Sequence, residues 1–401
     1  MLFQSVGSHY TLRQALAHAF RLGRRQHTSI LERTLSDRYK GRATLFSRGR
    51  AALAEAVRVA TGGEGAVVVN AFTCYSVVEA VQSAGCTVVY CDIDLSSLHY
   101  NGETLEQVLL DHPEVNAIIV QNTLGMPCDI EGIETVSRRH NVTIIEDLAH
   151  GAGLLYGDGR EAGTVGDITM LSFGRDKLLD SINGGALVMR MPDKLAHVKQ
   201  PVQQPQLRDQ LRDRVYPLLA VAIRTGYPIG LGKYLLAIAY KLHIAVRSAD
   251  GLLSTRVALP NWQAAQAYAR FSALNGDLEA RRKKRDSYHQ QLVGMRLPEA
   301  SLAASAAPIR IPVLSHRRDE IVAALKEKGY FFEDIWYDRP VSPARHYDKV
   351  GFDESLCPRA TLAAKTIFNL PTHQLVDDAA IGEICAVVNR FAPDVKTEEA
   401  G

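Results

Sequence analysis

Two side chains in residues 140–190 have types and positions that suit the chemistry of an electron-sink cofactor. Glu146-Asp147 closes an apolar run, and Lys177 follows a later run through a Ser-Phe-Gly turn. An aspartate can keep a pyridine ring protonated, and a lysine can hold an aldehyde as a Schiff base, which is what pyridoxal phosphate requires. Spacing alone leaves other interpretations open, because Asp147 also suits a helix cap and Lys177 a solvated surface group.

The surrounding pattern predicts the elements that would bring these two residues together. Short, nearly continuous apolar runs occupy 66–69, 87–90, 117–120, 143–145, 168–172 and 185–189. Such runs are typical of strands buried on both faces. Helical windows such as 76–84 and 130–140 lie between them, and this alternation predicts a wound, mostly parallel sheet. Functional residues of such folds lie at the carboxyl ends of the strands.

The same pattern divides the chain into three parts. A polar helical segment over 1–44 precedes a large α/β domain over 45–255, and a smaller α+β domain covers 256–395. In the last part, we predict one long helix over 258–293, a strand over 308–313, and helices over 318–328 and 377–390. The large domain ends in an apolar insert at about 200–255.

The insert contains two apolar stretches, 216–223 and 234–245. Arg224, Lys233 and Lys241 interrupt them, and neither reaches the ~20 apolar residues of a membrane span. Two interpretations stay open. The insert is either a helix pair at a subunit or domain interface, or a segment over 216–246 that makes peripheral contact with a membrane.

Composition excludes several classes of protein. The 46 Lys and Arg nearly balance the 44 Asp and Glu, which gives no reason to expect nucleic-acid binding. The six cysteines form no CxxC pair and have no histidine at zinc-ligand spacing, so we expect no metal site and a reducing compartment. The N-terminus lacks the pattern of a secretory signal, so we expect a cytoplasmic protein.

Several motifs together resemble the DegT/StrS family of pyridoxal-phosphate-dependent sugar aminotransferases, of which the chain looks like an outlying member. The family's EDxAxxxG segment is similar to 146–153, its GDxxxxSFxxxK stretch to 166–177, and the two glycines after the lysine to 184–185. Further similar segments are SRGRAAL at 47–53, NAFTCYSV at 70–77, NTLGMPCDI at 122–130, LPNWQAA at 259–265 and NLPTH at 369–373.

The resemblance implies a fold and an activity. The fold would be α/β, with a three-layer, mostly parallel mixed sheet (fold type I of pyridoxal-phosphate transferases) and a smaller C-terminal α+β domain. The activity would be transfer of an amino group from an amino acid, usually glutamate, to a nucleotide-linked keto sugar in polysaccharide or secondary-metabolite synthesis. The retained Lys177 argues against relatives that remove a hydroxyl, which carry histidine there. A homodimer is also implied.

The resemblance further implies the roles of single residues. Lys177 would be the catalytic Schiff-base lysine, Asp147 would pair with the pyridinium nitrogen, and His150 would lie beside the ring. The cofactor phosphate would be bound by Ser172, by the helix start at Gly49 and Arg50, and by Asn261 of a second subunit. Simpler roles compete: a satisfied strand end for Ser172, a packed histidine for His150, a tight turn for Gly49 and a helix cap for Asn261.

Some positions depart from the family pattern. Arg50 replaces a threonine, and its guanidinium either binds phosphate or points to solvent. Cys74 stands where many relatives stack an aromatic ring on the cofactor, unless Tyr75 takes that place. Asn122 and Asn183 replace His and Glu. Two other functions therefore stay open: a membrane-associated enzyme acting on a lipid-linked precursor, and a non-catalytic regulatory protein that keeps the fold.

Overall fold

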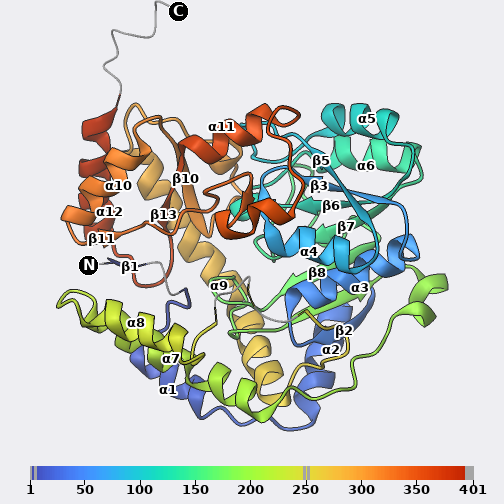
Figure 1. The fold of residues 1–401 in the computed structure, drawn as a ribbon, viewed down its shortest axis with the longest axis horizontal. Helices are drawn as coiled ribbons and strands as arrows, with labels where there is room; N and C mark the ends of the chain where they lie inside the picture. Colours follow the sequence, from blue (N-terminus) through green and yellow to red (C-terminus); the bar gives the residue numbers. More distant parts are fainter. Residues whose placement is uncertain (1, 4–6, 247–249, 251–252, 393–401) are drawn as a thin grey trace, which may run out of the picture.

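A seven-stranded sheet forms the centre of the molecule (Figure 1). The structure is a computed structural model that describes residues 2–3, 7–246, 250 and 253–392. Strand order is β2-β9-β8-β7-β6-β3-β5, and only β9 runs antiparallel to its neighbours. The bounds are β2 Arg42–Phe46, β3 Ala66–Asn70, β5 Thr87–Cys91, β6 Val115–Gln121, β7 Thr143–Asp147, β8 Ile168–Ser172 and β9 Gly185–Met189. The predicted mostly parallel mixed sheet is confirmed.

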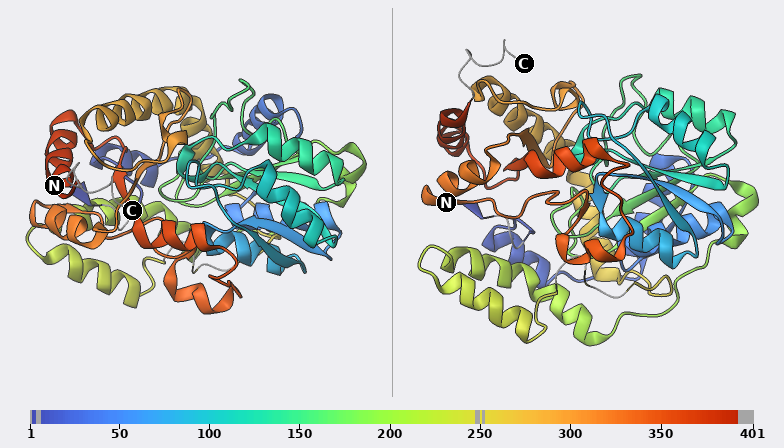
Figure 2. Two further views of the ribbon diagram at one scale, coloured as in Figure 1. Left: turned by 90° about the horizontal axis from the view of Figure 1, so that it is seen from above. Right: turned by 45° about the horizontal axis from the view of Figure 1, so that its top comes forward.

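Alternation along each strand sends side chains into two separate cores, one on each face of the sheet. In β3, Val67 and Val69 join one core, whereas Ala66 and Val68 join the other. Helices α3 (Gly49–Thr61) and α4 (Tyr75–Ser83) cover the first face. The opposite face is covered by α2 (Gln26–Tyr39), α5 (Gly102–Asp111), α6 (Ile130–Arg139) and part of α9 (Asn261–Gln291). Both faces are therefore buried, as the apolar runs predicted, and three layers result (Figure 2).

The C-terminal part forms an α+β unit that shares α9 with the sheet layer. Its antiparallel strands are β10 (Arg310–Leu314) and β13 (Ile367–Pro371), and its helices are α10 (Arg318–Glu327), α11 (Pro358–Thr366) and α12 (Asp378–Val388). These bounds agree closely with the predicted strand and helices. The edge strand β2 differs from expectation, since it crosses the predicted boundary at residue 44 and pairs with β9 alone. Leu2–Phe3 (β1) pairs with Tyr330–Phe331 (β11) of the C-terminal unit.

The apolar insert folds into two helices that pack on the N-terminal segment (Figure 1). α7 spans Leu207–Gly226 and packs against α1 (Leu12–Ala19), and α8 spans Leu231–Lys241 and packs against α7. Tyr216, Ala220 and Ile223 of α7 are buried against Tyr10 and Ala15. The chain itself therefore covers part of the first apolar stretch. Within the described residues, no helix has the length and apolar character that crossing a bilayer requires.

Candidate active site

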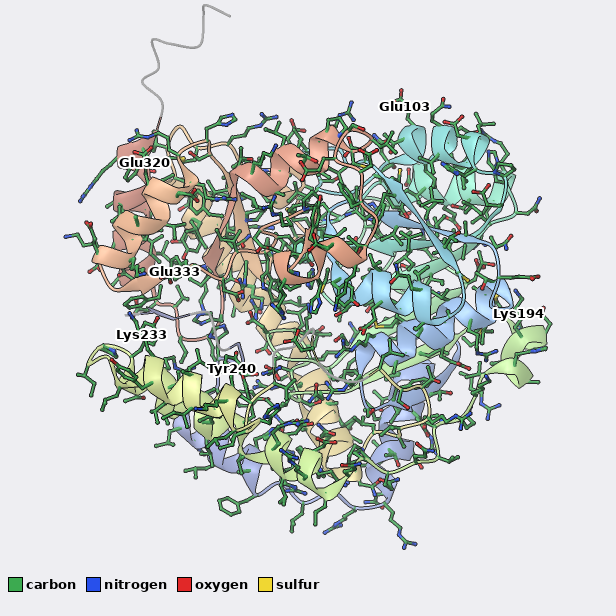
Figure 3. The ribbon with its side chains drawn as sticks, viewed as in Figure 1. Glu103, Lys194, Lys233, Tyr240, Glu320 and Glu333 are labelled. Atoms are coloured by element: carbon green, nitrogen blue, oxygen red, sulfur yellow. The ribbon has the colours of Figure 1, made fainter. Side chains whose placement is uncertain are left out.

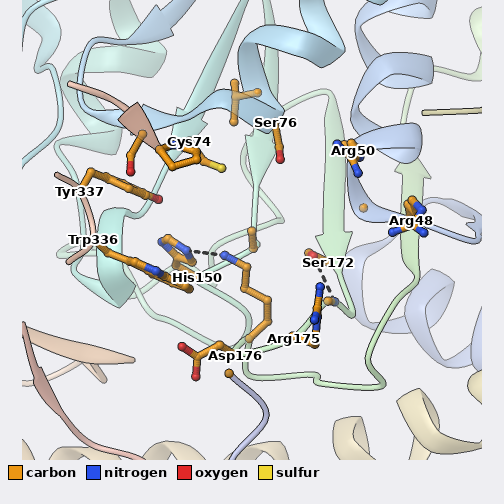
Figure 4. A pocket seen from close by; sticks show the side chains of 18 of the residues that line it. Arg48, Arg50, Cys74, Ser76, His150, Ser172, Arg175, Asp176, Trp336 and Tyr337 are labelled. Atoms are coloured by element: carbon orange, nitrogen blue, oxygen red, sulfur yellow. Dashed lines mark hydrogen bonds between the residues drawn. The ribbon is translucent and has the colours of Figure 1, made fainter. Parts of the chain in front are cut away.

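A cavity of about 440 Å³ lies at the carboxyl ends of the central strands. The ends of β6, β7 and β8, the start of α3 and a loop of the C-terminal unit over 333–345 all contribute to its wall. Asp147, Lys177 and Ser172 are among its lining residues, as are Gly49, Arg50, Cys74 and His150 (Figure 4). The fold thus brings together seven of the eight predicted site residues, which are separated by up to 128 positions in the sequence.

Asp147 ends β7 and points its carboxyl group toward the cavity, where it is almost fully buried. Its Oδ1 accepts a hydrogen bond from the Ala149 backbone N–H at 2.8 Å. Gln121, its register partner at the end of β6, places Nε2 at 3.5 Å from Oδ2. Burial raises the pKa of Asp147 to about 6, although the Ala149 N–H and nearby Lys177 favour the carboxylate. A cationic ring nitrogen at this carboxyl would offset that cost of burial.

Lys177 and His150 form a direct hydrogen bond, with Lys177 Nζ at 2.7 Å from His150 Nε2 (Figure 4). The backbone N–H of Leu124 donates to His150 Nδ1 at 3.1 Å. In a neutral imidazole the proton is then on Nε2, so Nε2–H donates to the amine lone pair. Burial lowers the pKa of Lys177, and burial together with Lys177 and Arg310 holds the pKa of His150 well below its usual range. The arrangement therefore favours an uncharged, nucleophilic amine.

The start of α3 faces the hydroxyl of Ser172 across a very short gap. A Cβ added to Gly49 would lie 2.8 Å from Ser172 Oγ, so only glycine fits without a shift. Ser172 Oγ also lies 3.3 Å from the Gly174 N–H, which donates to it. The first N–H groups of a helix lack intrahelical partners, so the start of α3 and the Ser172 hydroxyl together form an anion-binding site.

Arg50 lines the cavity and is buried, so its side chain does not point to solvent. Its buried guanidinium pairs with Glu79 of α4, with Nη1 at 2.7 Å from Oε2. This pair links α3 to α4 and uses one of the five N–H donors of the guanidinium. A phosphate role for the Arg50 side chain therefore stays a prediction. Its backbone N–H still belongs to the first turn of α3, where an anion would bind.

Cys74 lines the cavity at the end of β4 (Thr73–Cys74), which pairs with β12 (Val341–Ser342). Tyr75 turns away and stacks on His346, with 4.3 Å between ring centroids. Tyr75 is therefore engaged elsewhere. Asn261 begins α9 outside the cavity lining, where its Oδ1 accepts a 3.4 Å hydrogen bond from Thr28 Oγ1.

Sequence reasoning missed the loop that closes the cavity from the C-terminal unit. The indole of Trp336 lies over Lys177, with Nζ 4.6 Å from the ring centroid, and stacks on His150 at 5.5 Å. Behind it, Arg310 contacts the same indole at 4.1 Å and pairs with Asp176 at 2.5 Å. The segment has little regular secondary structure, so no periodic pattern marked it. The sequence did offer one signal for this loop: Trp336, one of only two tryptophans in the chain, stands beside Tyr337.

Two arginines at the cavity were also missed as site residues. Arg48 Nη1 donates to Asn183 Oδ1 at 2.9 Å, and burial lowers its pKa to about 10. Asn183 in turn donates to Asp213 of α7 at 2.8 Å. Arg175 stacks on Tyr216 of α7, with its guanidinium carbon 4.4 Å from the ring centroid. The insert is thereby attached to the cavity through polar and cation–π contacts.

The residues present fit pyridoxal phosphate. Lys177 offers a neutral amine for the aldehyde, and Asp147 offers a carboxyl group for the ring nitrogen. The α3 start and Ser172 offer donors for the phosphate, and the glycine at position 49 leaves room for it. These three functions converge on one cavity, which a structural cap or a solvated lysine would not require.

Similar proteins include two transaminases named for nucleotide-linked sugars and a regulatory protein. The match to dTDP-4-amino-4,6-dideoxy-D-glucose transaminase of Shigella dysenteriae is 30% identical and covers 39% of this chain and 42% of that protein. The match to UDP-N-acetyl-3-dehydro-alpha-D-glucosamine 3-aminotransferase of Acidithiobacillus ferrooxidans is 25% identical and covers 84% of this chain and 79% of that protein. The match to the pleiotropic regulatory protein of Geobacillus stearothermophilus is 25% identical and covers 79% of this chain and 75% of that protein.

The fold is that of a solved putative sugar aminotransferase of Streptococcus pneumoniae in its PLP form. The two chains superpose with a TM-score of 0.72 at 18% identity, and the superposition covers 98% of each. The sequence profile of the DegT/DnrJ/EryC1/StrS aminotransferase family matches residues 13–389. The chain therefore belongs to the DegT/DnrJ/EryC1/StrS family of pyridoxal-phosphate-dependent aminotransferases.

Proposed function

We propose that this enzyme transfers an amino group from an amino acid, glutamate in the first instance, to a keto sugar carried on a nucleotide. One observation carries the proposal: the amine of Lys177, whose pKa burial lowers, lies 2.7 Å from His150 Nε2 in the same cavity as the carboxyl group of Asp147. A regulator that only kept the fold would not need this costly buried arrangement. The two transaminase relatives support the sugar-nucleotide substrate class.

The chain's own residues have separable tasks. Bound pyridoxal phosphate supplies a protonated ring that stabilises negative charge on the substrate carbon. Asp147 holds the proton at the ring nitrogen, and the α3 start with Ser172 fixes the phosphate. Lys177 Nζ would hold the cofactor, and its amine would carry a proton to or from the substrate carbon. His150 orients Nζ, and Trp336 shields it from water on one side.

The decisive experiment is a substrate screen with the purified enzyme. The protein should show visible absorbance from lysine-bound cofactor. Amino acids are then tested one at a time, and a true amino donor should remove that absorbance band. Nucleotide-linked keto sugars should then restore the band and gain an amino group by mass. A protein that binds the cofactor but bleaches with no donor would refute the activity and favour the regulatory alternative.

We also propose a symmetric homodimer, which is the commonest form of soluble oligomer. Asn261 supports it, because this residue lies outside the cavity of its own chain and can contribute to a phosphate only across a subunit interface. Light scattering of active, detergent-free protein tests the proposal. A fully active monomer would refute both the dimer and the role of Asn261.

The six cysteines are free thiols, which supports a reducing, cytoplasmic location. A second candidate function is that of a membrane-associated enzyme of the same type that acts on a lipid-linked precursor. The apolar outer face of the insert favours this second candidate. Extraction of amino-sugar product with organic solvent, rather than with water, would distinguish it from the nucleotide-linked substrate.

A further inference from the structure

Exposed large apolar side chains gather on one part of the described surface. Of 22 such side chains, 14 belong to residues 10–25 and 207–246, which together hold 56 of the 401 residues. We name the surface of these two segments the apolar–basic face. Its apolar members are Leu12, Leu16, Phe20, Leu22, Leu207, Leu211, Val215, Ile229, Leu231, Tyr234, Leu235, Ile238, Leu242 and Ile244. Soluble monomers rarely expose so many without a binding role.

The exposed side chains follow helical spacing on each helix of the face. They recur every four residues on α1 and on the first half of α7, and every three or four residues on α8, as the positions given above show. The opposite side of each helix is already buried in the molecule, as Ala15, Tyr216 and Ala239 show. Each helix thus has two apolar sides. The inner side packs against the rest of the molecule, and no described residue covers the outer one.

Charge on the face is strongly one-sided. Six cations on it are exposed (Arg13, Arg24, Arg25, Arg208, Lys233 and Lys241), whereas both of its aspartates are only partly exposed. The other four arginines of the two segments are partly buried. In all, the two segments hold ten Arg and Lys against two Asp and no Glu, whereas the whole chain has a net charge of +2. The remainder of the protein is therefore negative. A two-fold contact centred on this face would bring two such basic surfaces together, so we expect the homodimer proposed above to use a different surface. An anionic bilayer offers complementary charge, and long Lys and Arg side chains can reach its headgroups while apolar neighbours insert.

The face is fixed to the molecule before any partner binds. Arg214 Nη1 donates to the carbonyl oxygens of Ala19 at 3.2 Å and Arg21 at 3.0 Å. His18 Nε2 lies 3.2 Å from the Asp213 carbonyl oxygen. These bonds hold α1 against α7, so binding to a partner would not cost the conformational entropy of ordering the helices.

The helices of the face also reach the active-site cavity. Tyr216 of α7 and Tyr240 of α8 are among the cavity-lining residues, and Tyr216 carries the stacked guanidinium of Arg175. Figure 3 shows Tyr240 on the inner end of α8 and Lys233 toward its outer end, and both views of Figure 2 place α7 and α8 at the periphery. We propose that the apolar–basic face binds peripherally to the surface of an anionic lipid bilayer, which brings the cavity beside that surface.

Co-sedimentation with vesicles tests this proposal without any readout of activity. The cofactor-loaded enzyme should sediment with vesicles of phosphatidylcholine and phosphatidylglycerol, and much less with phosphatidylcholine alone or at high salt. Two double variants, Phe20→Glu/Leu22→Glu on the α1 side and Leu235→Glu/Ile238→Glu on α8, should each lower the partition coefficient about tenfold or more. Their side chains are well exposed, so the fold should survive, and circular dichroism verifies it.

The matched control is Leu110→Glu/Leu356→Glu, which places two glutamates at exposed leucines outside the face (61% and 75% exposed). It should sediment like the wild type. Three results would overturn the proposal: wild-type protein that stays in the supernatant with anionic vesicles, an equal loss in the control, or face variants that turn a dimer into monomers. The last result would assign the face to a second copy. Because the sugar substrate takes no part, failure here leaves the proposed activity untouched.

Discussion

The Nε2–H of His150 donates to Nζ of Lys177 at 2.7 Å, because the Leu124 backbone N–H already occupies Nδ1. The direction of this hydrogen bond requires an uncharged lysine, and the lowered pKa of Lys177 agrees with it. An imidazolium at this position would instead repel a nearby ammonium group. A backbone contact from the 3₁₀ segment Thr123–Gly125 thus selects the tautomer of His150 that faces Lys177.

Lys177→Ala should abolish covalent cofactor binding and turnover while leaving the fold intact. No other lysine lines the cavity among the described residues, so none can replace the amine. The visible absorbance band and its fixation by borohydride measure the bond, and circular dichroism monitors the fold. Lys283→Ala, at a 75% exposed side chain on α9, is the matched control and should retain both band and activity. Undiminished turnover in Lys177→Ala would show that another lysine carries the chemistry.

Asp147→Asn should keep the cofactor bound and reduce turnover by about 10²–10⁴-fold or more. The amide cannot hold a proton at the ring nitrogen, so negative charge on the substrate carbon loses its stabilisation. The anion-binding site at Gly49 and Ser172 is unchanged, which is why affinity should persist. Single-turnover rates with saturating donor measure the effect. A rate within a few-fold of wild type would make Asp147 a capping residue only.

The same substitution should stabilise the cofactor-free protein, in a pH-dependent way. The pKa of Asp147 is raised from 3.8 to about 6 by burial, so the folded state holds this proton more tightly than the unfolded state. Stability should therefore fall as pH rises from about 4 to about 6 and stay lower above that window. Asn carries no charge, so above about pH 7 Asp147→Asn should be more stable by about 1–3 kcal/mol, with no gain near pH 3.5.

Urea unfolding of cofactor-free protein at both pH values measures this difference. Asp158→Asn is a control of opposite sign, since that carboxylate pairs with Arg160 at 2.5 Å and its loss should not stabilise the protein. An Asp147→Asn variant that is less stable at neutral pH would mean that the folded carboxyl group is already well paired without the cofactor.

The sequence predicted most of what depends on periodic burial and on motifs. Six of the seven sheet strands were found, because each is apolar on both faces; β2 was missed because RATLF lies at the sheet edge and starts with an exposed arginine. Strand ends and motif order predicted that Lys177 and Asp147 lie close together, and both line the cavity. Trp336 was not predicted as a site residue. It lies in an irregular loop of the C-terminal unit, and such a loop has no hydrophobic periodicity from which its position could be predicted.

Pairing choices were equally hidden from the sequence. The alternatives for Arg50 were a phosphate or solvent; the structure buries the side chain, and its ion pair with Glu79 was not predicted. That partner lies 29 positions away on a different helix, and only the packing of α3 on α4 brings the two together. Charge alone could not select it among the 44 acidic residues of the chain.

Gly49→Ala should weaken cofactor binding without unfolding the protein. The new Cβ would lie 2.8 Å from Ser172 Oγ and 3.2 Å from its Cα, so the start of α3 and the end of β8 must move apart. Both donors for the phosphate then move, and we expect the dissociation constant for pyridoxal phosphate to rise about tenfold or more. Fluorescence titration of cofactor-free protein measures it. Gly276→Ala on α9, where an added Cβ meets nothing within 4 Å, is the matched control and should bind as the wild type does. Unchanged affinity in Gly49→Ala would place the phosphate away from α3 and reduce Gly49 to a residue of close packing.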